Sequence, residues 1–215
     1  MNLPFTIDEF LAVFASYNAA IWPFQIVAYG LGLIALLAVF VPRSGLVRLA
    51  VTALSILWAA TGVGYHWLFF ATINPIAPVF AGLFILQALL FLASATRPGD
   101  LQLHLGQDFR SVAGLVTLVY ALAIYPVLGI WAGHGLLKGP MFGVAPCPTT
   151  IFTIGMLLIA RGQWVIWLSI VPILWSMIGL AAAIQLGIPE DLAMPLAGAI
   201  LAAMLLGTRR NVAVT

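Results

Sequence analysis

Charge is scarce in this sequence. Lys, Arg, Asp and Glu make up 7% of the 215 residues, whereas 64% of the residues are hydrophobic. Because a soluble domain carries about one quarter charged residues, this composition excludes an ordinary soluble protein. The net charge of +2 comes from basic residues scattered between apolar runs, so it does not predict nucleic-acid binding. A lone cysteine, Cys147, excludes an internal disulfide.

Long apolar runs fill most of the chain. Runs of about 20 apolar residues are typical of membrane-spanning helices. We therefore expect an all-α integral membrane protein that forms a single domain over residues 1–215 in contact with the lipid bilayer. The seven expected spans are 22–41, 48–71, 77–96, 111–132, 148–160, 163–184 and 192–207.

The basic residues fall on one side of these spans. Of the basic residues, Lys138 alone lies in the second, fourth or sixth connection between spans. The other seven lie in or beside the remaining connections and in the C-terminal tail. Because basic residues favour the cytoplasmic side, we expect the N-terminus outside and the C-terminus inside a bacterial inner membrane. The seven are Arg43, Arg48, Arg97, Arg110, Arg161, Arg209 and Arg210.

Two parts of the chain resemble each other. "PFQIVAYGLGLIA" (23–35) and "PTTIFTIGMLLIA" (148–160) share six of thirteen residues, and "ILWAATG" (56–62) and "ILWSMIG" (173–179) share four of seven. These matches predict parallel repeats over 22–96 and 148–207 joined by the helix 111–132, an arrangement known in small transporters. Chance similarity between apolar segments is the alternative.

The stretch "GHGLLKGPMFGVAPCPTTIFTIG" (133–155) contains Cys147 between two prolines. A helix over 148–160 would cover roughly 20 Å of a hydrocarbon core about 30 Å thick. We therefore expect a re-entrant loop that leads into a short helix whose first-turn amides suit an anion or a carbonyl oxygen. A well-capped surface loop is the alternative.

Several polar residues are expected at the same end of the bundle. The predicted ligand-binding residues are His66, Asn74, His134, Cys147, Thr149 and Thr150. Of these, His66, His134 and Cys147 have the side chains that zinc or copper prefers, although no pair has the spacing of a zinc motif. Packing or capping roles are the alternatives, and we expect Glu190 and Asp191 to cap the last helix.

Three functions are compatible with this pattern. The first is transport or binding of a small solute or soft metal ion at an outward-facing site. The second is a membrane enzyme that uses Cys147 as nucleophile and His134 or His66 as base. The third is a structural subunit, in a homo-oligomer or a larger membrane complex.

Four stretches carry a family resemblance: "NLPFTIDEFLAVFASYNAAIWP", "YHWLFFATINPIA", "PCPTTIFTIG" and "GIPEDL". Together they resemble an uncharacterised family of bacterial multi-pass inner-membrane proteins, a domain of unknown function with a PCPTTIFT motif. The resemblance covers nearly the whole chain. It implies a membrane protein and no particular activity.

Overall fold

The described part of the chain is all-α apart from one very short pair of strands. The computed structural model describes residues 4–97, 99–135 and 138–212, with side chains up to residue 207. The first half contains α1 (Ile7–Ala20), α2 (Phe24–Phe40), α3 (Ser44–Ala60), the π-helix η1 (Thr61–Phe69), the 3₁₀ turn η2 (Phe70–Thr72) and α4 (Ala77–Ala95). The second half contains β1 (Gln102–Leu103), α5 (Phe109–Val119), the π-helix η3 (Tyr120–Ile124), α6 (Tyr125–Trp131), α7 (Pro146–Ile159), β2 (Ala160–Arg161), α8 (Trp164–Leu186), the 3₁₀ turn η4 (Pro189–Leu192) and α9 (Ala193–Val212).

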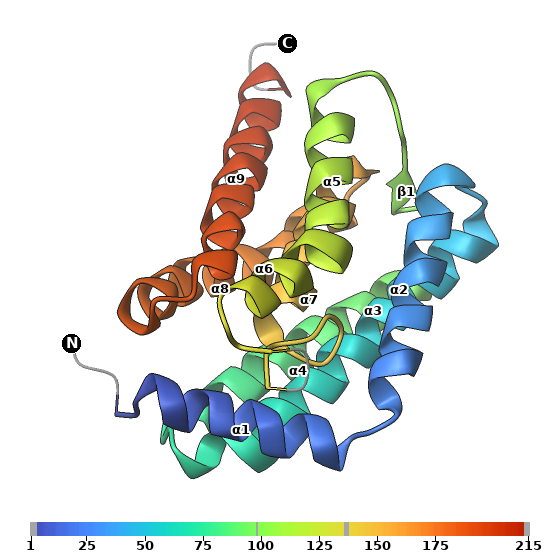
Figure 1. Ribbon diagram of the computed structural model, residues 1–215. Coiled ribbons are helices and arrows are strands. Elements are labelled where there is room, and N and C mark those ends of the chain that lie inside the picture. The colour runs from blue at the N-terminus through green and yellow to red at the C-terminus, as the bar shows by residue number, and fades with distance from the viewer. Residues whose placement is uncertain (1–3, 98, 136–137, 213–215) are drawn as a thin grey trace.

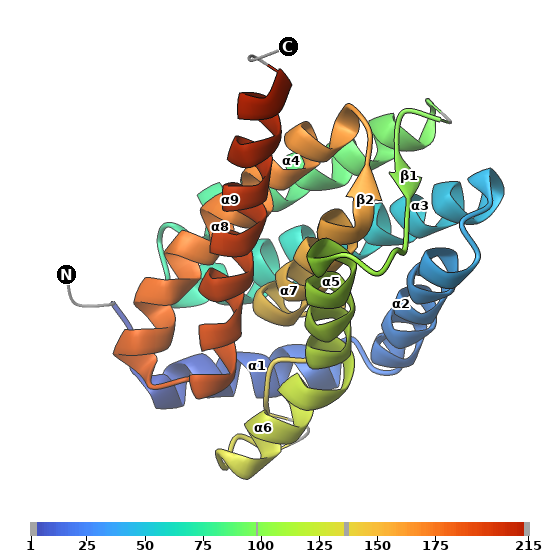
Figure 2. The same ribbon diagram turned by 90° about the horizontal axis from the view of Figure 1, so that it is seen from above.

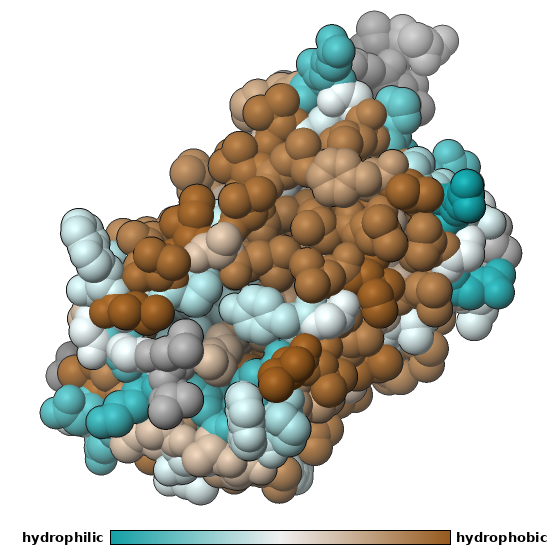
Figure 3. Space-filling model, turned by 45° about the vertical axis from the view of Figure 1, so that its right-hand side comes forward, coloured by the Kyte–Doolittle hydropathy of each residue, from teal (hydrophilic) through white to brown (hydrophobic). Residues whose placement is uncertain are grey.

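Within the described residues, five helical segments are long and apolar enough to cross a membrane. They are Ser44–Thr72, Ala77–Ala95, Phe109–Trp131, Trp164–Leu186 and Pro189–Gly207. Large apolar side chains are exposed along these helices, and Figure 3 shows a broad hydrophobic surface with hydrophilic residues towards its two ends. The chain is therefore a membrane-embedded helical protein.

The two remaining predicted spans differ from the other five. Residues 22–41 form α2, which meets α1 at an angle of 88° and counts as a sixth span only together with it. Pro23 separates the two helices, because proline has no amide proton for a continuous helix. Residues 148–160 form α7, which has 14 residues and is shorter than a span. Length and composition thus support five or six spans.

The centre of the bundle is α7. Every residue of α7 except Cys147 is buried, and Figure 2 shows α7 enclosed by α3, α5, α8 and α9. Pro146 and Pro148 lie in its first turn, where missing amide protons cost nothing. Because α7 contacts protein on all sides, it does not need the length of a lipid-exposed helix.

Glycine allows α5 to approach α7 closely. A Cβ on Gly114 would lie 2.5 Å from Ile159 Cγ1 and 2.8 Å from the carbonyl oxygen of Gly155. A Cβ on Gly155 would lie 3.0 Å from the carbonyl oxygen of Gly114. Small residues at facing positions are the usual device for close helix packing in membranes.

The strands β1 and β2 mark one end of the bundle, which we call the strand end. They pair antiparallel, with Gln102 opposite Arg161 (Figure 2). Arg110 donates to the carbonyl oxygens of Leu158 and Ala160, which end α7. Asp108 caps α5 through the amide of Ser111 (2.8 Å) and forms an ion pair with Arg161 (2.9 Å). Arginine side chains therefore close the last turn of α7, where carbonyl groups lack helical partners.

Gly114→Ala is expected to lower the free energy of unfolding by about 1–3 kcal/mol, because the new methyl group meets a backbone oxygen that cannot move aside. Reversible unfolding in mixed micelles measures this change. Gly30→Ala in α2 is the matched control, since its Cβ would meet nothing within 4 Å. Equal stability of the two variants would contradict the close crossing of α5 and α7.

Asp108→Asn is expected to lower the free energy of unfolding at neutral pH, and to lower it less as the solution is made acidic. Hydrogen bonds from the side chain and the amide of Ser111, together with the Arg161 guanidinium, hold the pKa of the Asp108 carboxyl below its ordinary value of 3.8. A lowered pKa stabilises the fold above pH 3.8, and this contribution is lost as the pH falls through the lowered value. Unfolding of both proteins between pH 7 and pH 3 should give stability curves that converge in acid, and parallel curves would exclude this role.

Candidate functional site

The π-helix η1 presents two polar side chains to the interior. It continues α3 with a wider turn and carries Tyr65 and His66. Both side chains are buried, and the ring of His66 lies 4.7 Å from that of Phe84 and 5.1 Å from that of Trp175. Neither ring nitrogen of His66 has a hydrogen-bond partner among the residues described. π-Helical turns are often found at functional sites.

The start of α7 reaches the same region from another side. The non-helical segment 141–145 is packed into the protein, where Gly143 has a φ of +78° and lies against Ala28 of α2. Cys147 follows in the first turn of α7 and is the one half-buried residue of that helix. Its thiol lies beside the Asp191 carboxylate and the Trp175 indole.

Two adjacent carboxylates complete the site. Glu190 and Asp191 lie in η4 and are both buried, with 0% and 3% of their surface exposed. Tyr125 donates to Asp191 Oδ1 at 2.5 Å, and His134 Nδ1 lies 2.7 Å from Glu190 Oε1. Gly129 of α6 leaves room for Glu190, because a Cβ there would lie 3.2 Å from Glu190 Oε1. Buried carboxylates are costly without such partners.

These residues form a continuous group that we call the buried polar cluster. It lies at the end of the bundle where α7 begins, opposite the strand end (Figure 1). Its members are Tyr65, His66, Tyr125, His134, Cys147, Trp175, Glu190 and Asp191.

Four polar atoms of the cluster have no protein partner among the described residues. They are Tyr65 Oη, His66 Nδ1 and Nε2, and Glu190 Oε2. A buried polar atom without a partner costs about 1–3 kcal/mol. Native proteins therefore supply such atoms with ordered water or a ligand. The cluster thus offers donors and acceptors that water or a small polar ligand can use.

The three residues predicted as metal ligands have different neighbours in the structure. The described part of the chain holds no group of three or more His, Cys, Asp or Glu side chains placed to bind a metal ion. Aromatic rings surround His66, Glu190 binds His134, and Cys147 lies beside Asp191. Each predicted ligand of zinc or copper therefore has a different environment.

Three other predicted ligand-binding residues have separate surroundings. Asn74 begins the turn before α4, and its Oδ1 accepts from the amide of Ile76 at 3.1 Å. Thr149 donates to the carbonyl oxygen of Ala145 and accepts from the amide of Gly143, so it holds the loop before α7. Thr150 is fully buried, and its hydroxyl has no partner within the described ranges.

The enzyme hypothesis gains no support from these contacts. A cysteine nucleophile needs a base within hydrogen-bond reach. No hydrogen bond joins Cys147 to His66 or His134 among the described residues, and His134 is occupied by Glu190.

Sequence reasoning missed the carboxylates and their partners. Glu190 and Asp191 were expected to cap the last helix, but their carboxylates bind His134 and Tyr125 instead. Tyr125 is 66 positions from Asp191, so no local spacing rule could have paired them. The available signal was the presence of two acids beside an apolar run, which in a membrane protein indicates a functional site.

The chain matches a known protein family over nearly its whole length. The model of the "Family of unknown function (DUF6064)" matches residues 7–214. The chain belongs to this family. Searches of curated proteins and of solved structures gave no match. Membership of DUF6064 therefore brings no activity to the chain.

Tyr125→Phe is expected to lower the free energy of unfolding by about 1–2 kcal/mol, because Asp191 then loses a hydrogen bond inside the protein. Asp191→Asn and the double variant complete a thermodynamic cycle that isolates the coupling between the two side chains. Tyr29→Phe is the control, since the ring of Tyr29 packs against Phe142 outside the cluster. Strictly additive effects of Tyr125→Phe and Asp191→Asn would show that the two side chains do not interact.

Proposed function

We propose that this protein binds a small polar solute from the outer side of the membrane, at the buried polar cluster, and that it acts in transport or binding of that solute. The observation that carries this proposal is the set of four buried polar atoms without protein partners around Cys147 and Asp191. Apolar packing alone would favour hydrophobic side chains at these positions, because polar ones cost free energy there.

The cluster has the chemistry for a ligand with both donors and acceptors. Tyr65 can donate, and the free oxygen of Glu190 can accept. His66 can do either, according to its tautomer. The aromatic rings near His66 add an apolar wall, a combination common in small-molecule sites.

We place the entry to the cluster beside Cys147. This residue is partly exposed while its neighbours in α7 are buried. The short loop 141–145 precedes it as non-helical backbone within the protein. Such backbone is tolerated at membrane depth where it lies against protein or a wet cavity, which supports a re-entrant entry to the site.

The proposed topology has seven helical passages with the N-terminus outside a bacterial inner membrane. Arg110 and Arg161 lie at the strand end, and Arg48 and Arg97 line a cavity there that also includes Gln102 of β1. This gathering supports an inner position for the strand end. In this topology α2 and α7 are short passages, and a duplication of 22–96 as 148–207 accounts for their shared sequence pattern.

Labelling of Cys147 tests the proposal directly, because the chain has no other cysteine. A small cationic methanethiosulfonate reagent that does not cross membranes is added to intact cells. We expect it to modify Cys147, since water reaches the cluster from outside. Asp191→Asn should lower the rate at which the cationic reagent modifies Cys147 by about threefold or more, relative to the rate with an uncharged reagent. The reason is that the neighbouring negative charge, which attracts the cation, is removed.

Cys147→Ala combined with Ser44→Cys is the matched control. Ser44 is exposed at the strand end, so its cysteine should react only after the cells are permeabilised. If Cys147 reacts with the charged reagent only after denaturation, the cluster is tightly packed and closed to water, and the proposal is wrong. If Ser44→Cys reacts in intact cells, the proposed orientation is wrong.

A further inference from the structure

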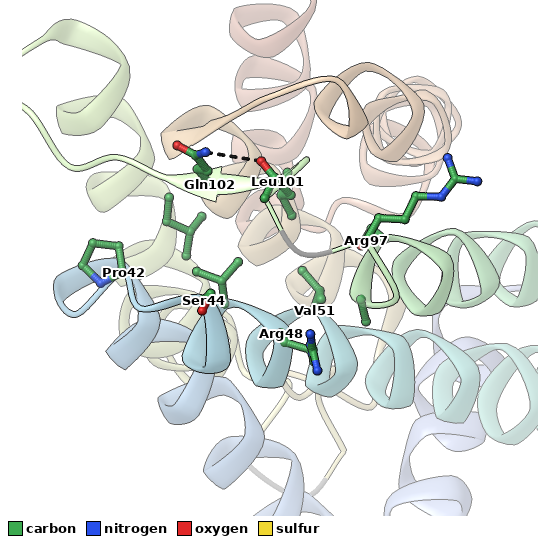
Figure 4. A pocket seen from close by; sticks show the side chains of 12 residues that line it. Pro42, Ser44, Arg48, Val51, Arg97, Leu101 and Gln102 are labelled. Carbon is green, nitrogen blue, oxygen red and sulfur yellow. Dashed lines mark hydrogen bonds between the residues drawn. The ribbon is translucent and has the colours of Figure 1, made fainter.

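A cavity lies at the strand end, away from the buried polar cluster. It has a volume of about 380 Å³ and lies between the start of α3, the end of α4 and the strand β1. Figure 4 shows Ser44, Arg48 and Val51 along α3, Arg97 just after the end of α4, and Leu101 and Gln102 further along the connection that follows. Three segments that are distant in the sequence therefore share one hollow.

The rim of this cavity is positively charged. Arg48 and Arg97 line it, and both are exposed. Neither forms an ion pair with a carboxylate among the described residues, whereas Arg161 pairs with Asp108. The Arg97 guanidinium lies 5.7 Å from the ring of Trp164, which orients its side chain without neutralising its charge.

The floor of the cavity is apolar. Val47, Val51, Leu101 and Leu103 line it and also line a narrow crevice that continues to Met156 and Leu157 of α7. A small hydrophilic anion would gain nothing from this floor. An anion that carries a hydrocarbon chain would contact both parts of the cavity.

The surroundings of the cavity lie at the edge of the apolar surface. Leu49 follows Arg48 directly and is 56% exposed, and Leu92 near the end of α4 is 49% exposed. Exposed leucines in a membrane helix contact lipid chains. Arginines beside them lie at the level of lipid headgroups, where basic residues attract anionic lipids.

We infer that this cavity binds the phosphate headgroup of an anionic phospholipid, with Arg48 and Arg97 on the phosphate and the lipid chain along Val47, Val51 and Leu101. Arginine suits this task because its guanidinium presents several donors to phosphate oxygens. The site is independent of the solute proposed for the buried polar cluster.

Native mass spectrometry of the full chain in detergent tests this inference. The probes are phosphatidylglycerol, phosphatidylcholine with the same acyl chains, and inorganic phosphate. We expect one saturable phosphatidylglycerol molecule to bind more tightly than phosphatidylcholine. The variant Arg48→Gln/Arg97→Gln should weaken that binding by at least about tenfold, because each arginine near a headgroup contributes to attraction.

Arg209→Gln/Arg210→Gln is the matched control, since it removes the same charge from the C-terminal tail. This control should retain the affinity of the wild type. If both double variants lost the same affinity for phosphatidylglycerol, the binding would be general electrostatic attraction to the protein, and the proposed site would be wrong. Phosphatidylcholine bound as tightly as phosphatidylglycerol would overturn it too.

The measurement with inorganic phosphate distinguishes a lipid headgroup from a soluble anion as the ligand. If inorganic phosphate binds as tightly as phosphatidylglycerol and displaces it, the ligand is a soluble anion and the lipid inference is wrong. If Arg48→Gln/Arg97→Gln fails to fold, Arg48→Lys/Arg97→Lys replaces it. That variant keeps the charge but loses the guanidinium donors, so it should retain preference for the anionic lipid with lower affinity, and a lost preference would count against the site.

Discussion

The complete burial of α7 is the constraint on which the rest of the structure depends. A helix of 14 residues with only Cys147 partly exposed must be surrounded by other helices. Close contact with α5 requires glycine at both Gly114 and Gly155. On the side of α3, the indole of Trp58 donates to the hydroxyl of Thr153 at 2.8 Å, so a polar side chain in the core also has its partner. The lipid-facing helices are therefore arranged around a helix that itself has no contact with lipid.

The two ends of α7 meet different chemistry as a result. At its C-terminal end, Arg110 and Arg161 bind the last carbonyl groups and join the helix to the loop before α5. At its N-terminal end, Cys147 lies beside a buried carboxylate that Tyr125 binds. Cations at the C-terminus and anions at the N-terminus of a helix both interact favourably with its dipole. The charges at the two ends of α7 thus stabilise the same short helix.

Much of the fold could be predicted from the sequence, because apolar runs and prolines act locally. The run 148–160 with Pro148 at its start predicts a short helix, and α7 ends within one residue of that range. The sharp angle between α1 and α2 and the π-helical turn at His66 could not be predicted. Both depend on how neighbouring helices pack, which a single sequence does not encode in its periodicity.

The candidate site was harder to predict, because its members come from six separate segments. Cys147 and His134 were predicted to lie in one region, and the acids beside them were interpreted as helix caps, whereas the structure places Glu190 on His134 and Asp191 beside Cys147. Local rules favour that interpretation, since an acid before a helix usually binds the helix's own amides. In this protein Glu190 and Asp191 are buried, and their carboxylates bind side chains from α6 and the loop that follows it instead.

Hydrogen–deuterium exchange in lipid nanodiscs tests the central claim, which is that α7 is a buried helix whose start contacts a wet polar cluster. The account predicts rapid deuterium uptake in peptides covering 146–151 and very slow uptake in peptides covering 154–159. A dry, tightly packed cluster would instead leave both ends of α7 equally protected, and that result would contradict the account.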